Sequence, residues 1–160
     1  MSRTFRSRIA AVDRYLAKGY DEVRGMSSRF SATICWHLLR RQSEMGVHGS
    51  VAEIGTFEGR FFIAMGLALG DGEHAYGFDL FSWPGSHVLE RLLANADTHG
   101  LSRDRFTPRS VDTGKLNAQE FSALTGGAPL RFIHIDGDRL DARSEHLACE
   151  PASAGPSVYR

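Results

Sequence analysis

Acidic residues and glycines recur in this sequence directly after short apolar segments, where they can bind a ligand. Glu53 precedes the turn 55–59, Asp79 ends a second apolar segment, and Asp136 ends a later one. Carboxylates accept hydrogen bonds from hydroxyl groups and pair with cationic groups, and glycines allow tight turns beside a ligand. The spacing therefore predicts a binding site for a small molecule that carries hydroxyl groups and a positive charge.

The apolar segments alternate between the patterns of strands and helices. We expect strands at 50–54, 74–80, 105–108 and 130–135, and helices at 59–69, near 88–93 and at 116–124. This alternation indicates an α/β fold with a mostly parallel sheet. In such sheets the carboxyl ends of the strands meet at one edge, where ligands bind. Glu53, Asp79, the segment 110–112 and Asp136 should therefore lie around one crevice.

Two further helices are expected before the first strand. One helical face carries Phe5, Ile9, Val12 and Leu16, and Gly19 marks its end. An apolar stripe of Phe30, Ile34 and Leu38, widened by Cys35, Trp36 and Leu39, predicts a second helix at 28–45. We divide the chain into these N-terminal helices (1–48), a Rossmann-like core (49–138), and a short helix and tail (139–160).

The composition is that of an ordinary globular protein. The chain has 160 residues, of which 42% are hydrophobic, and its 19 Lys and Arg balance its 19 Asp and Glu. Such a balance offers no bulk charge for nucleic-acid binding, and the longest apolar stretch, 61–69, is too short to cross a bilayer. We therefore expect no nucleic-acid or membrane partner. The two cysteines form no C-x-x-C pair, which favours the cytoplasm.

The glycine turn discriminates between nucleotide ligands. The dinucleotide fingerprint G-x-G-x-x-G needs a glycine where this chain has Phe57, and the charge of Glu58 would oppose a pyrophosphate. NAD and FAD are therefore disfavoured, and the lack of a following Gly-Lys-Ser/Thr excludes a P-loop. Asp79 can accept hydrogen bonds from the 2′- and 3′-hydroxyls of a ribose, and Glu53 can face an ammonium group. A ligand with both a ribose and an ammonium group, such as S-adenosylmethionine (SAM), matches these two carboxylates.

Three motifs occur in order: Glu53-x-Gly55-x-x-x-Gly59, then Gly77-Phe78-Asp79-Leu80-Phe81, then Arg131-Phe132-Ile133-His134-Ile135-Asp136-Gly137-Asp138. Over roughly 15–138 the chain resembles the class I SAM-dependent methyltransferases, most of all the branch whose fourth strand ends in I-D-G-D/G-H. The resemblance implies that the turn after the first strand holds the methionine part of SAM, Asp79 holds the ribose, and Ser110 and Asp112 lie near the adenine. The cofactor-binding residues that we expect are Glu53, Gly55, Thr56, Phe57, Gly59, Asp79, Leu80, Ser110, Asp112 and Asp136.

The chain departs from this family in two places. It has Arg139 where the family tends to have histidine after I-D-G-D. Some relatives bind a divalent cation with the strand-four aspartate, so Asp136 and Asp138 are candidate ligands for Mg²⁺. The family's sheet has seven strands in the order 3-2-1-4-5-7-6, whereas only 137–160 follow the fourth strand here. We therefore expect the order 3-2-1-4 alone, in a chain that is truncated or frame-shifted near Arg139.

The expected function is that of a SAM-dependent methyltransferase acting on a small-molecule hydroxyl group. The alternative is a truncated, inactive Rossmann-like remnant that at most binds the cofactor or self-associates through the exposed edge of its fourth strand. Structural roles also remain open for single residues. The segment 136–138 is equally compatible with a plain strand-to-loop turn, and Asp79 also fits a helix cap or a turn. His134 fits a packed, hydrogen-bonded core histidine better than a general base.

Overall fold

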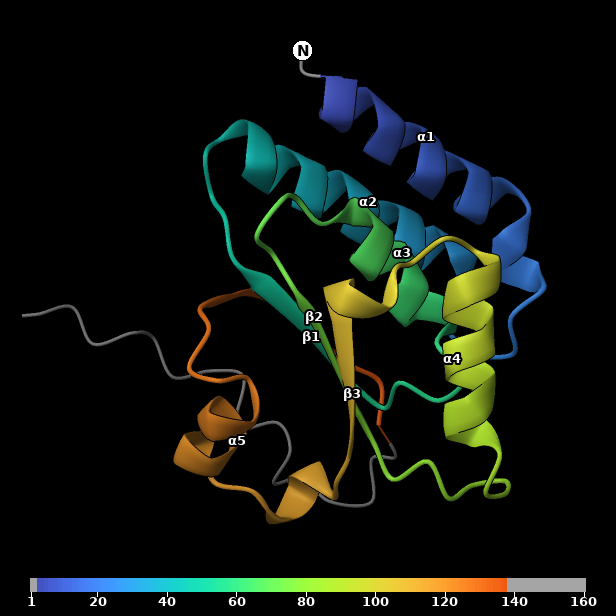
Figure 1. Ribbon diagram of the computed structural model, residues 1–160, viewed down its shortest axis with the longest axis vertical. Helices are drawn as coiled ribbons and strands as arrows, with labels where there is room; N and C mark the ends of the chain where they lie inside the picture. Colours follow the sequence, from blue (N-terminus) through green and yellow to red (C-terminus); the bar gives the residue numbers. More distant parts are fainter. Residues whose placement is uncertain (1–2, 138–160) are drawn as a thin grey trace, which may run out of the picture.

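The computed structural model describes residues 3–137, with side chains from Ala10 onward (Figure 1). Its helices are α1 (Arg3–Ala17), α2 (Arg29–Glu44), α3 (Arg60–Ala68), α4 (Val88–Thr98) and α5 (Ala118–Leu124). Its strands are β1 (Ser50–Ile54), β2 (Ala75–Asp79), β3 (Phe106–Ser110) and β4 (Leu130–Ile135). Short 3₁₀ helices cover Gly19–Asp21, Arg103–Arg105 and Thr113–Lys115. The expected helix and tail at 139–160 lie outside the described residues.

The strands form one parallel sheet in the order β3-β2-β1-β4, as predicted. The bounds of β1 and β4 match the prediction, whereas β3 ends two residues later than expected. Pro108, where the predicted strand ended, has no backbone N–H to donate to a neighbouring strand. In the structure β3 lies at an edge of the described sheet and pairs only with β2, so Pro108 needs no partner on its other side.

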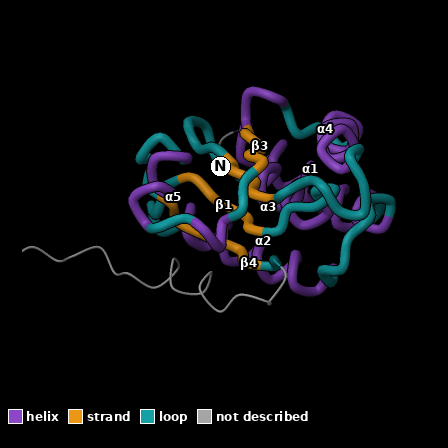
Figure 2. The backbone as a smooth tube through the Cα atoms, turned by 90° about the horizontal axis from the view of Figure 1, so that it is seen from below, coloured by secondary structure: helices purple, strands orange, loops and turns teal. Residues whose placement is uncertain are grey.

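Helices cover the two faces of the sheet unequally. Figure 2 shows the strands between α5 on one side and α1 to α4 on the other. Val51 of β1 packs into the core under α1 to α4, while its neighbours Ala52 and Ile54 pack with Phe121 of α5. Strand alternation therefore places Glu53 on the same face as Val51, under the N-terminal helices. Within residues 3–137 no helix has both the length and the hydropathy to span a bilayer.

Helix α2 occupies the predicted range, and only one side of its apolar stripe is buried. The stripe of Phe30, Ile34 and Leu38 is 45–74% exposed, whereas Trp36 and Leu39 are at most 5% exposed. Both sets of residues have helical spacing, so periodicity alone cannot choose between them. The face with Trp36 packs into the core cluster that includes most of α3. The sequence placed both sets of residues in one wide apolar stripe, and only the side with Cys35, Trp36 and Leu39 is buried.

A buried ion pair joins β4 to the turn before β2. The Arg131 side chain is 1% exposed, and its Nη2 lies 2.8 Å from Oε2 of Glu73, which is also buried. The same guanidinium donates to the carbonyl oxygens of Gly49 and Leu39, at 3.1 and 2.9 Å. These bonds connect the start of β4, the end of α2 and the approach to β1. They therefore hold α2 against the edge of the sheet.

We expect Arg131→Met to destabilise the protein by about 3 kcal/mol, because it leaves the Glu73 carboxylate buried without its cation. Urea unfolding at pH 7 measures this loss. Arg103→Met is the matched control, since Arg103 pairs with Asp97 on the surface, where solvent screens the pair and the loss should be much smaller. Equal losses in the two variants would contradict a structural role for the buried pair.

Candidate functional site

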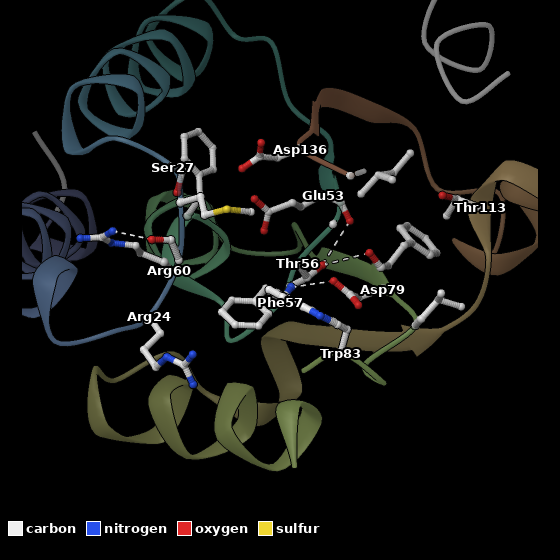
Figure 3. A pocket seen from close by; sticks show the side chains of 18 of the residues that line it. Arg24, Ser27, Glu53, Thr56, Phe57, Arg60, Asp79, Trp83, Thr113 and Asp136 are labelled. Atoms are coloured by element: carbon white, nitrogen blue, oxygen red, sulfur yellow. Dashed lines mark hydrogen bonds between the residues drawn. The ribbon is translucent and has the colours of Figure 1, made fainter. Parts of the chain in front are cut away.

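A cleft of about 1090 Å³ opens at the carboxyl ends of the strands (Figure 3). Its volume slightly exceeds the range that is usual for small-molecule sites. Its walls come from six segments: the chain before α2 (21–27), the turn after β1, the first turn of α3, the end of β2 with the loop that follows, the segment 111–114, and the end of β4. The crevice predicted from the sequence is therefore present.

Gly55 determines how closely β1 and β4 approach each other at the cleft. It has a φ of +85°, and a Cβ atom there would lie 2.5 Å from the Asp136 carbonyl oxygen. The Gly55 N–H donates to Phe78 O of β2, and the Asp136 N–H donates to Ile54 O of β1, both at 2.8 Å. A turn without a side chain thus brings the ends of β1, β2 and β4 together.

The Asp79 carboxylate fixes two loops at once. Its Oδ2 accepts the N–H of Phe57 at 2.8 Å, and its Oδ1 accepts the N–H of Phe81 at 2.8 Å. Phe57 and Phe81 both have positive φ angles, of 50° and 52°, which non-glycine residues rarely adopt. Each carboxylate oxygen can accept a second hydrogen bond. Asp79 is therefore a turn residue and still has acceptor capacity towards the cleft.

Glu53 is a buried carboxylate in the wall of the cleft, with a 2% exposed fraction. Its Oε1 accepts a hydrogen bond from His134 Nδ1 at 2.9 Å, whereas its buried Oε2 accepts none from residues 3–137. The pKa of Glu53 is raised from 4.5 to about 7. Burial is the largest cause, the hydrogen bond from His134 acts in the opposite direction, and the negative charges of Asp136 and Asp79 raise the pKa further. A buried oxygen without a donor is costly, so Oε2 is suited to a donor from a ligand.

His134 itself has the structural role that the sequence left open. Its ring stacks on Phe61 of α3, with ring centroids 3.8 Å apart and an angle of 13° between the planes. Together with the bond to Glu53, this stacking makes His134 a packed, hydrogen-bonded residue, as one of the two interpretations expected.

The segment 21–27 forms a wall of the cleft that the sequence did not predict. Arg60, the first residue of α3, holds it by donating to the carbonyl oxygens of Tyr20 and Gly25, at 2.9 and 2.8 Å. A third bond joins Arg60 to Asp21 at 3.0 Å. These contacts use mainly backbone oxygens, which leave no pattern in the residue types. The cleft residues that sequence reasoning missed include Asp21, Val23, Arg24, Gly25, Met26, Ser27, Val111, Thr113 and Gly114.

Most of the predicted cofactor residues line the cleft: Glu53, Gly55, Thr56, Phe57, Asp79, Leu80, Asp112 and Asp136. Gly59 and Ser110 lie outside the lining. A side chain at Gly59 would overlap Leu92 of α4, and the Ser110 hydroxyl donates to Leu80 O at 3.1 Å. Asp112 lies near the 3₁₀ helix Thr113–Lys115 and accepts the Gly114 N–H at 3.2 Å.

The environment of Glu58 differs from the expectation. Its side chain is 4% exposed, and its Oε1 lies 3.2 Å from Arg24 Nη1 and 2.9 Å from Arg91 Nη1. Two guanidinium groups more than offset one carboxylate, so the argument that Glu58 repels a pyrophosphate was wrong. The steric argument against a dinucleotide, which rests on Phe57, stays a prediction.

The residues described here do not form a metal site. Among residues 3–137 no group of three or more His, Cys, Asp or Glu side chains is arranged to hold a metal ion. Asp136 lines the cleft, whereas Asp138, the other candidate ligand, lies outside the described residues. The described residues therefore supply one of the two expected ligands, and the Mg²⁺ site stays a prediction.

No protein-family model and no curated protein matches this sequence. Solved structures do match. An O-methyltransferase from Bacillus cereus in complex with SAH (S-adenosylhomocysteine) has 19% identity and a TM-score of 0.53, over 82% of this chain and 55% of that one. TomG from Streptomyces achromogenes, an O-methyltransferase of tomaymycin synthesis in complex with SAM, has 16% identity and a TM-score of 0.52, over 86% and 54%. Cofactor-bound Rv0187 from MTB has 19% identity and a TM-score of 0.52, over 86% and 55%.

These likenesses concern the fold. The described residues have the Rossmann-like α/β fold of class I SAM-dependent O-methyltransferases, with the strand order 3-2-1-4. The chain spans about half the length of the three structures.

We expect Gly55→Ala to destabilise the protein by about 3 kcal/mol or more, because it combines an unfavourable φ with a clash against the Asp136 backbone. Gly72→Ala is the matched control: Gly72 has a φ of +79° but no atom within 4 Å of its Cβ position, so about 1 kcal/mol should be lost. Thermal and urea unfolding compare the two. Equal losses of stability in the two variants would show that the close approach of β4 to residue 55 does not contribute to the loss.

The raised pKa of Glu53 predicts a pH dependence of stability without ligand. The stabilisation from its folded-state protonation is fully present below about pH 4.5 and is lost as the pH rises through about 7. Glu53→Gln stays neutral at every pH. Between pH 5 and 8 its unfolding free energy should therefore fall less than that of the wild type, and the two falls should differ by about 3 kcal/mol at most. Glu90→Gln, at an exposed site, should follow the wild type. Parallel curves for all three proteins would refute a buried, protonatable Glu53.

Proposed function

We propose that this chain binds SAM in the cleft and functions as a methyltransferase that acts on a hydroxyl group of a small molecule. The observation that carries the proposal is the unpaired, buried Oε2 of Glu53 beside the Asp79 carboxylate, at the ends of the neighbouring strands β1 and β2. A ligand with an ammonium group and a ribose satisfies both carboxylates. Three solved structures of the same fold support it, since two are described as complexes with SAM or SAH and one as cofactor-bound.

Each part of the cofactor has a chemically matching part of the cleft. Glu53 Oε2 would accept a hydrogen bond from the ammonium group, and the free acceptor positions of Asp79 would take the ribose hydroxyls. Leu80, which is 56% exposed, and Val111 offer apolar contacts for the adenine. Asp112 lies next to Val111 in the same wall. No phosphate has to be bound, which agrees with Phe57 in the place of a glycine.

The protein's share of such a reaction is orientation and exclusion of water. When bound, SAM supplies a methyl group on a positively charged sulfur. Glu53 and Asp79 would hold the two ends of the cofactor, and the segment 21–27, which Arg60 ties down, would screen it from solvent. The cleft also has space for an acceptor beside a cofactor. The proposal assigns no role to a divalent cation, since only Asp136 of the two candidate ligands is among the described residues.

Binding of SAH to the chain, measured by isothermal titration calorimetry, tests the proposal. We expect saturable binding to the wild type and at least about 10-fold weaker binding to Asp79→Asn, which lowers the acceptor capacity towards the ribose. Asp71→Asn, in an exposed turn away from the cleft, is the control and should bind as the wild type does. NADH should show no fluorescence enhancement.

Two results would contradict the proposal: no binding at millimolar SAH, or equal binding by the wild type and Asp79→Asn. Release of SAH from SAM in the presence of hydroxyl-bearing acceptors tests turnover separately. Binding without turnover would favour the alternative of an inactive, cofactor-binding remnant.

A further inference from the structure

The His134–Glu53 pair couples the edge of the sheet to the cleft. The two residues are register partners on the neighbouring parallel strands β4 and β1, and both face the helices α1 to α3. His134 Nδ1 lies 2.9 Å from Glu53 Oε1, and the imidazole is fixed by its stacking on Phe61. The position of the imidazole is thus fixed by the pairing of β4 with β1 and by its contact with the Phe61 ring.

His134 is the sole donor to the Glu53 carboxylate within residues 3–137. The other groups around Glu53 do not compete for this role. The Tyr15 hydroxyl donates to Arg60 O at 2.8 Å, and the guanidinium of Arg60 donates to Tyr20 O, Gly25 O and Asp21. The remaining charged neighbours, Asp79 and Asp136, are carboxylates and repel an ionised Glu53.

A single donor has a geometric consequence, because the terminal torsion of a glutamate is broad and turns easily. The bond to His134 occupies Oε1 and so leaves Oε2 as the oxygen available to a ligand. Figure 3 shows Glu53 in the wall of the cleft between Asp136 and Thr56. Without the donor, the carboxylate can turn, and neither oxygen is held in place.

We propose that His134 is a positioning residue that orients Glu53 towards the ammonium group of the ligand, and so makes the cleft select nucleosides that carry an amino acid. This inference rests on the proposed function. It assigns to His134 an effect on one end of the ligand only. The nucleoside end, which Asp79 and the segment 111–114 would contact, should not depend on His134.

Two ligands separate these ends: SAH, and 5′-methylthioadenosine, a nucleoside thioether that lacks the amino acid. His134→Phe keeps a ring on Phe61 but removes the donor, and it should weaken SAH binding about 10-fold, the effect of one hydrogen bond to a charged group. Binding of 5′-methylthioadenosine should change less than about 2-fold. His134→Asn, whose amide can donate from nearly the place of Nδ1, should restore SAH binding to within about 3-fold of the wild type.

A double variant guards against an effect of folding. Glu53→Gln lacks the carboxylate, so adding His134→Phe to it should change SAH binding less than about 2-fold. Equal weakening of both ligands by His134→Phe, no weakening of SAH, or a full 10-fold further loss in the double variant would overturn the inference. A wild type that binds neither ligand would overturn the proposed function and the inference with it, whereas normal binding of both ligands by His134→Phe would overturn the inference alone.

Discussion

The missing side chain at residue 55 is the constraint on which the rest of the site depends. The turn after β1 has a positive φ, and the backbone of Asp136 lies where a Cβ atom would be. This contact lets the end of β4 lie directly against the end of β1. The register of the sheet then sets Glu53 opposite His134, and Asp79 lies at the end of β2, two residues beyond Gly77, the register partner of Glu53. The absence of a side chain at residue 55 thus allows residues from β1, β2 and β4 to lie around one cleft.

The assembled cleft concentrates negative charge, and each carboxylate is stabilised in a different way. Asp79 accepts two backbone N–H groups, Asp136 is exposed to water, and Glu53 is buried with one donor and a raised pKa. With Asp21 and Asp112, five carboxylates line the cleft against the two cations Arg24 and Arg60, and a further cation among them relieves their repulsion. The electrostatics therefore favour a ligand with positive charge. Glu58, neutralised by Arg24 and Arg91, adds nothing to this negative field.

The sequence predicted the features that depend on local pattern. Ser50–Ile54 and Leu130–Ile135 were identifiable because short apolar runs end at turn residues, and the acidic strand ends followed from the parallel sheet. It did not predict which face of α2 is buried, because two helical stripes compete and the packing on α3 decides between them. Nor did it predict the wall 21–27, since that segment is held by hydrogen bonds from Arg60 to backbone oxygens.

The distribution of these contacts separates binding of the cofactor from chemistry on an acceptor. Every cleft-lining group that we assign to the cofactor lies within 53–136, and the wall that screens it is fixed by Arg60. Binding therefore needs only interactions that the described residues make among themselves. Methyl transfer needs, in addition, groups that orient an acceptor, and the matched part of this chain covers only 54–55% of the three similar structures. For this reason evidence for binding of the proposed cofactor does not decide whether methyl transfer takes place, and the two have to be measured separately.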